Sequence, residues 1–255
     1  MVLPILSFLT LLSGIVLLSY LAFIFGRRLG VREATRKDRE HDGPVGSHVA
    51  ATLGLLAFTL AIVFNMAHEK HSGRKELVRN DALAIHTAYR RAQLLPPGEA
   101  EFAQQKIAEY AEVRALDLYA GPAPEIDTRI ARSEELQAEL WSHAIKNRDA
   151  RDLWFYMEAL NKMADAHAER VTMGVHDRIP RAVWYILALV TMFSMVAMGD
   201  QSALAGSRRA IAIIPMVFAF SLVLCVAIDL DRPRTGILRV DQGPMIRLQQ
   251  TLEQR

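Results

Sequence analysis

Residues 45–67 have the sequence VGSHVAATLGLLAFTLAIVFNMA, which contains no Asp, Glu, Lys or Arg. Three other windows share this property, namely 2–25, 182–199 and 210–228. An uncharged apolar helix of about 18 or more residues is long enough to cross a hydrocarbon core of roughly 30 Å. Four such windows in one chain exclude an ordinary soluble domain, and they predict an all-α integral membrane protein with four transmembrane helices.

The overall charge, the cysteine count and the N-terminal sequence narrow the class of protein further. The 255 residues include 30 Lys and Arg against 28 Asp and Glu, and a net charge of +2 is too small to indicate a nucleic-acid partner. The single cysteine, Cys225, excludes a disulfide within the chain. The first apolar run has no basic residue before it and no Ala-x-Ala after it, so we expect a retained anchor rather than a cleaved signal peptide.

The four spans divide the chain into two transmembrane hairpins, one domain between them and a tail. The predicted boundaries are 1–67 for the first hairpin (spans at about 2–25 and 45–67), 68–180 for the extramembrane domain, 181–228 for the second hairpin (spans at about 182–199 and 210–228) and 229–255 for the C-terminal tail. The extramembrane domain lies between transmembrane helices two and three. It is expected to be helical, because its apolar residues recur at intervals of three and four. The first such stripe consists of Val78, Ala82, Ile85, Tyr89 and Ala92.

Motifs for catalysis or cofactor binding are not found in the sequence. His68 and His71 are three residues apart and could share a helix face, but no HExxH motif or cysteine cluster supplies further metal ligands. They are interpreted as histidines at the membrane surface. No span carries a charged residue of the kind that proton pumps and intramembrane enzymes use. We therefore expect no enzyme activity, no catalytic residue, no metal and no cofactor.

Several motifs resemble those of a bacterial family of uncharacterised bestrophin-like membrane proteins. They are GLLAF at 54–58, ELVRNDALAIHTAYRRAQLLP at 76–96 and DLDRPRTG at 229–236, with a weaker match in RIPRAVW at 178–184. Together with the order of the four spans, this resemblance covers nearly the whole chain. It implies a distant relation to the bestrophins, which are homopentameric anion channels whose second span lines the pore.

The resemblance also implies candidate pore residues in the second span. When Phe58 is aligned with the last aromatic residue of the bestrophin neck, Ala50 and Gly54 occupy the two earlier neck positions. Only Phe58 keeps a bulky side chain there, and the acidic calcium-binding run of animal bestrophins is absent from this sequence. Phe58 could instead pack against lipid or another helix. Asn65, the most polar residue of the span, is a further pore candidate or a donor to a neighbouring helix.

Charged residues gather where the last two spans meet the membrane surface. Asp229 and Asp231 follow the fourth span, where the helix dipole disfavours acids, so the following Arg232 and Arg234 are expected to neutralise them. Arg178 and Arg181 precede the third span. Either a capped membrane exit or a subunit contact at the mouth of a pore is expected from five of these residues, namely Arg178, Arg181, Asp229, Asp231 and Arg232.

The sequence leaves two functions open. One is a bestrophin-like oligomeric channel that conducts small anions, and the other is a non-conducting scaffold or sensor whose helical domain binds a partner. Small residues in the second span, including Ala50, Gly54 and Ala57, favour close packing between copies of the chain. The expected partners are thus the lipid bilayer, small anions and further copies of the chain, as a pentamer if the resemblance extends so far.

The distribution of basic residues predicts the orientation. Eight lie in the loops at 26–47 and 200–209, whereas eleven flank the spans on the side of the middle domain and the tail. Since basic residues near span ends favour the cytoplasm, we expect the middle domain and both termini to lie in the cytoplasm, with the spans in a bacterial inner membrane.

Overall fold

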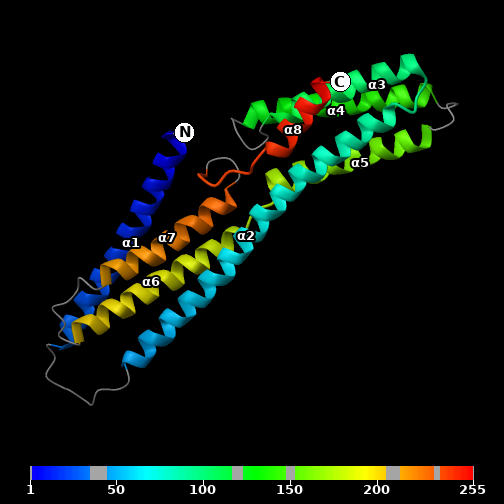
Figure 1. The fold of residues 1–255 in the computed structure, drawn as a ribbon. Helices are drawn as coiled ribbons and strands as arrows, with labels where there is room; N and C mark the ends of the chain where they lie inside the picture. The colour runs from blue at the N-terminus through cyan, green and yellow to red at the C-terminus, as the bar shows by residue number, and fades with distance from the viewer. Residues whose placement is uncertain are drawn as a thin grey trace. The chain divides into compact units, whose positions relative to one another are not determined.

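The computed structural model describes residues 2–34, 45–116, 123–147, 153–204, 213–232 and 236–254. These residues contain helices and turns but no strand (Figure 1). The helices, in chain order, are α1 (Val2–Ala34), α2 (Val45–Ala92), α3 (Pro97–Ala115), α4 (Ala123–Lys146), α5 (Leu153–Val171), the π-helix η1 (Thr172–His176), α6 (Arg181–Leu204), α7 (Ile213–Asp231) and α8 (Gly243–Glu253).

The predicted fold class is confirmed. Four helices, α1, α2, α6 and α7, are long and apolar enough to cross a membrane, and the helices between α2 and α6 supply the helical domain. All four helices extend beyond the C-terminal ends of the predicted windows, because a helix can continue past an apolar run through charged and polar residues. The loops predicted at 26–47 and 200–209 fall partly outside the described residues.

The chain forms two compact units. Unit 1 comprises Met1–Lys70 and Arg178–Leu238, and unit 2 comprises His71–Asp177 and Arg239–Arg255. Helix α2 therefore begins in unit 1 and ends in unit 2. The domain boundaries inferred from the sequence, with a separate tail from residue 229, stay predictions.

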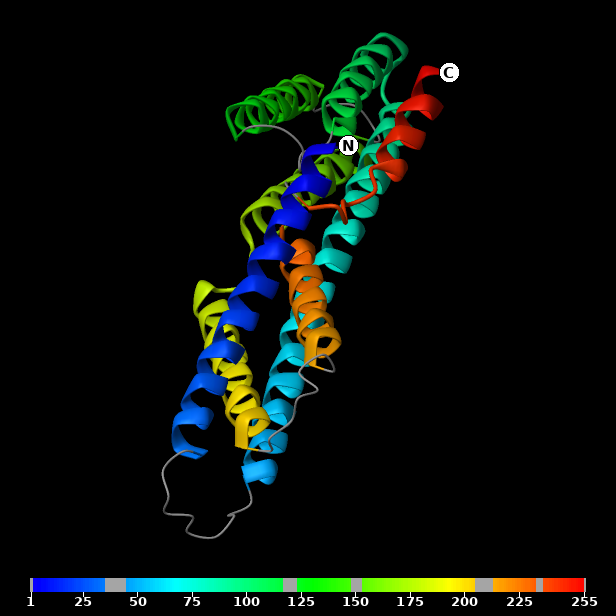
Figure 2. The same cartoon turned by 90° about the vertical axis from the view of Figure 1, so that its left-hand side faces the viewer.

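Glycines set the packing of α1 in unit 1. Helix α1 lies beside α6 and α7 in both views (Figures 1 and 2). A Cβ atom at Gly26 would overlap the backbone of Val196, and one at Gly199 would overlap that of Phe23. Gly26 and Gly30 have the small-xxx-small spacing that lets two membrane helices approach closely. The α1–α6 pair is thus held by backbone contact that larger residues would prevent.

The spans bury only part of their apolar surface within one chain. The buried share of the most apolar window ranges from 17% in α1 to 33% in α6 and α7. Large side chains such as Leu17, Tyr185 and Phe193 are exposed. Because such surface is costly in water, these faces require lipid or further protein around them.

Unit 2 has a conventional helical core. The stripe predicted on α2 is confirmed, since Val78, Ala82, Ile85, Tyr89 and Ala92 are all buried. They pack with apolar residues of α3, α4 and α5 in one cluster. The C-terminal helix α8 joins this core through Met245, Leu248 and Leu252 and lies against α3. This last element was not predicted from the sequence.

Candidate pore and membrane-exit sites

Helix α2 presents an unpaired apolar face in unit 1. Its inner face packs on the other spans through Val49, Leu56, Leu60, Val63 and Ala67. Ser194 of α6 adds a hydrogen bond, donated by its Oγ to the carbonyl oxygen of Thr52 at 3.2 Å. The helix therefore has one fixed face, and the opposite face is open within the chain.

The candidate pore residues all lie on this open face. Ala50, Gly54, Phe58 and Asn65 are exposed, and the side chain of Phe58 is 65% exposed. A Cβ atom at Gly54 would meet nothing within 4 Å. The Asn65 side chain donates to Glu69 Oε1 of the same helix at 2.8 Å, rather than to a neighbouring helix. We define these four residues as the α2 open face.

The two acidic residues in the last turn of α7, Asp229 and Asp231, accept hydrogen bonds from backbone N–H groups. The two carboxylate oxygens of Asp229 accept from the N–H groups of Ile237 and Leu238, at 3.1 and 2.9 Å. Asp231 Oδ1 accepts from the N–H of Ile179 at 3.0 Å. Both carboxylates are buried. Asp229 thus ties the end of α7 to residues 237 and 238, whereas Asp231 ties it to the segment that leads into α6.

The other charged candidates meet at one cavity of unit 1. Arg178, Arg181, Asp231 and Arg232 line it together with residues of α1, α6 and α7. Asp229 and the α2 open face contribute nothing to its lining. The residues predicted as one membrane-exit group are therefore divided between a structural turn and a cavity with a basic opening.

Unit 2 contains a fully buried charge cluster that sequence analysis missed. Asp81 Oδ2 accepts from Arg114 (Nη2, 2.6 Å; Nε, 3.0 Å) and from Arg170 (Nη1, 2.8 Å). Arg170 also donates to the side-chain oxygen of Gln242 at 2.7 Å. One carboxylate therefore connects α2, α3 and α5, and Arg170 extends the cluster to the segment before α8. A signal was present, since Asp81 is three residues after Val78 and four before Ile85 on the apolar stripe.

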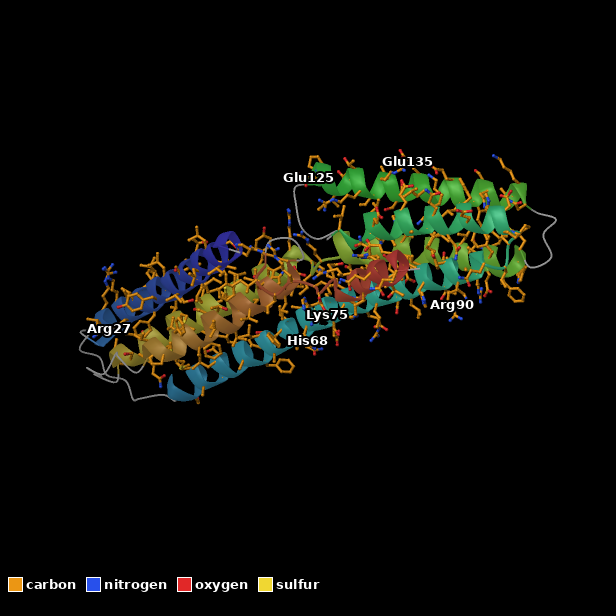
Figure 3. The ribbon with its side chains drawn as sticks, turned by 45° about the horizontal axis from the view of Figure 1, so that its top comes forward. Arg27, His68, Lys75, Arg90, Glu125 and Glu135 are labelled. Carbon is orange, nitrogen blue, oxygen red and sulfur yellow. The ribbon has the colours of Figure 1, made fainter. Side chains whose placement is uncertain are left out.

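Two histidines of unit 2 make hydrogen bonds within the helical domain. In unit 2, burial and then the positive charge of Arg114 lower the pKa of His167 to about 4, so its ring is neutral at physiological pH. Its Nδ1 lies 3.4 Å from the hydroxyl of Tyr110, which accepts a hydrogen bond from Gln137 at 2.9 Å. Within the described residues, no group of three or more His, Cys, Asp or Glu side chains could hold a metal ion. The charged side chains labelled on unit 2 are exposed, namely Lys75, Arg90, Glu125 and Glu135 (Figure 3).

Comparison with known proteins identifies the family. The bestrophin-like domain matches residues 13–245, so the chain belongs to the bestrophin-like family. Similar solved structures include a point mutant of a bacterial bestrophin homologue from Klebsiella pneumoniae, with 13% identity, a TM-score of 0.63 and 97% of each chain covered. Another is a point mutant of a membrane protein, with 14% identity, a TM-score of 0.64, and 97% of this chain and 96% of that chain covered. No curated protein matches the sequence. The predicted family resemblance is confirmed, and the two structures establish the fold.

We predict that Asp81→Asn destabilises the protein by about 3–5 kcal/mol, because it leaves the charges of Arg114 and Arg170 buried without their carboxylate. Thermal unfolding of the purified full-length protein in detergent measures the loss. Glu76→Gln is the matched control. Glu76 faces Arg79 across an exposed 3.8 Å pair on the same helix, and its loss is expected to cost less than about 1 kcal/mol. Equal effects of the two variants would contradict a structural role for the cluster.

Proposed function

We propose that this protein forms a homo-oligomeric membrane channel for small anions, in which the α2 open face lines the pore. The observation that carries the proposal is that this face is exposed and, apart from Asn65, apolar, while the opposite face of the α2 span packs on the other spans. Since lipid or protein has to cover such a face, copies of the chain around a common axis would place it toward the centre. Membership of the bestrophin-like family supports the same arrangement.

The absence of acidic side chains from the α2 span favours a pore for anions over a pore for cations. From residue 45 to residue 68, α2 carries no Asp or Glu, whereas cation pores commonly carry rings of acidic side chains. Arg178 and Arg181 are exposed where α6 begins. Phe58 is the largest side chain of the α2 open face, and hydrophobic constrictions can gate a pore by excluding water. Phe58 would therefore form the narrowest point.

We predict that Phe58→Ala raises the chloride conductance of the purified protein in planar bilayers several-fold, because it widens the constriction. Phe193→Ala is the matched control. Phe193 lies on α6 and is 67% exposed, close to the 65% of Phe58, yet it is outside the proposed pore and its removal should leave the conductance unchanged. A reversal potential that follows the cation gradient would contradict anion selectivity. Silence of both the wild type and Phe58→Ala would favour the scaffold or sensor.

Assembly through the same face has its own test. We predict that Gly54→Leu lowers the subunit number measured by native mass spectrometry or in lipid nanodiscs, because the new side chains would crowd one another where the copies pack around the shared axis. Within one chain a Cβ at Gly54 meets nothing, and neither does one at Gly14. Gly14→Leu on α1 is therefore the control and should assemble as the wild type does. A monomeric wild type would contradict the proposal.

We further propose that unit 2 and both termini lie in the cytoplasm of a bacterial cell, with the spans in the inner membrane. The larger number of basic residues on the side of unit 2 supports this orientation. The only natural cysteine, Cys225, is buried and gives little background in labelling. We predict that an impermeant maleimide labels Arg28→Cys on intact cells, but labels Ser142→Cys only after the inner membrane is opened. The reverse pattern would show the opposite orientation.

A further inference from the structure

A cavity of about 510 Å³ lies in unit 1 between α1, α6 and α7. This volume falls within the range of about 300–1,000 Å³ that is common for sites of small organic ligands. Most of the wall is apolar, and it comes from three different spans. The apolar lining includes Ile15, Leu18, Ala188, Met192, Leu224 and Ile228.

Two polar side chains of the cavity lining, Thr191 and Asp231, already have hydrogen-bond partners. Thr191 Oγ1 donates to the carbonyl oxygen of Leu187 in its own helix at 2.8 Å. Asp231 accepts from the backbone N–H of Ile179. A ligand in the apolar part therefore gains from burial of hydrocarbon rather than from hydrogen bonds.

The cavity carries positive charge where α6 begins and α7 ends. Arg178 and Arg181 come from the start of α6, and Arg232 directly follows α7. Within the described residues, none of these three guanidinium groups makes an ion pair with a carboxylate. Asp231 is the one acidic residue in the lining, so arginines outnumber acids there. Guanidinium groups bind phosphate through paired hydrogen bonds.

The position of this charge matches the surface of a bilayer. Trp184 is three residues into α6 from Arg181 and also lines the cavity. Trp and Arg at the end of a span are typical of the headgroup level, where apolar side chains give way to polar ones. The basic groups would then lie at headgroup depth, and the apolar wall would lie at the depth of the acyl chains.

We propose that this cavity is a binding site for an anionic phospholipid, whose phosphate contacts Arg178, Arg181 and Arg232 and whose acyl chain fills the apolar part between α1, α6 and α7. A free inorganic anion would use the arginines but leave the apolar wall exposed. A neutral lipid or a detergent would fill the apolar part without using the excess positive charge. Only an anionic lipid satisfies both parts, and basic pockets between spans are known sites for such headgroups.

Native mass spectrometry of the full-length protein in detergent tests this, with dioleoyl phosphatidylglycerol and dioleoyl phosphatidylcholine as probes. Their acyl chains are identical, so a difference reports on the headgroup. The wild type should retain phosphatidylglycerol preferentially, and rising salt should weaken this preference. The double variant Arg181→Gln/Arg232→Gln should bind phosphatidylglycerol roughly tenfold more weakly, which corresponds to about 1.4 kcal/mol. It should leave phosphatidylcholine binding unchanged.

Two further variants define the site. Ala188→Trp fills the apolar part and should weaken the binding of both lipids. Arg79→Gln is the control, since Arg79 is an exposed arginine in unit 2, and it should bind lipid as the wild type does. If the double variant does not fold, the preference of the wild type, its salt dependence and Ala188→Trp remain decisive.

Three results would overturn the proposal. Equal retention of the two lipids by the wild type would exclude headgroup recognition. Unchanged lipid binding in Ala188→Trp would place the lipid elsewhere. Displacement of phosphatidylglycerol by millimolar inorganic phosphate alone would identify a free-anion site instead. None of these measurements depends on current, so the lipid site can fail or hold separately from the channel function.

Discussion

A polypeptide in hydrocarbon has no water to satisfy its N–H and C=O groups, so each crossing has to be a helix whose hydrogen bonds are internal. Helices α1, α2, α6 and α7 meet this requirement. Their backbones can then approach only where side chains are absent, as at Gly26 and Gly199. Lipid does not drive apolar faces together as water does, and this explains how large apolar side chains can remain on the outside of unit 1.

In both units, buried carboxylates accept hydrogen bonds that connect separate segments of the chain. In unit 2, Asp81 accepts from two arginines of different helices, and Gln242 brings the C-terminal segment to the same cluster. In unit 1, Asp229 and Asp231 accept backbone N–H groups at the end of α7. A buried charge is tolerated only where such partners replace its hydration. These acidic residues therefore determine how chain segments meet.

Two surfaces of unit 1 differ in the partner that they suit. The α2 open face is uncharged, its one polar group is the amide of Asn65, and two of its four residues are small, which suits contact with other copies or a narrow conduit. The cavity between α1, α6 and α7 combines a concave apolar wall with arginines, which suits one amphipathic molecule. Protein assembly and lipid binding would thus use different helices of the same unit. A bound lipid could affect assembly only through the packing of α1, α6 and α7.

The sequence by itself determined the class of protein, because span length and the absence of charge follow directly from the thickness of the bilayer. It also determined the helical middle domain and the family, since the apolar stripe on α2 and motifs such as DLDRPRTG are local patterns. The four residues of the α2 open face could be named from the resemblance. The exposure of these four residues could not be predicted from the sequence, because it depends on which face of α2 the other spans cover.

Only the tertiary structure decided which distant residues meet. Asp81, Arg114, Arg170 and Gln242 are far apart in the chain, and no local pattern links a carboxylate to one arginine among many. The sequence assigned Asp229 and Asp231 to neighbouring arginines. In the folded chain, Asp229 accepts from the N–H groups of Ile237 and Leu238, and Asp231 accepts from the N–H group of Ile179, 52 residues away in the sequence. The lipid cavity likewise exists only because α1 lies beside α6 and α7. Its walls come from segments more than 150 residues apart, and their contact is a property of the packed helices.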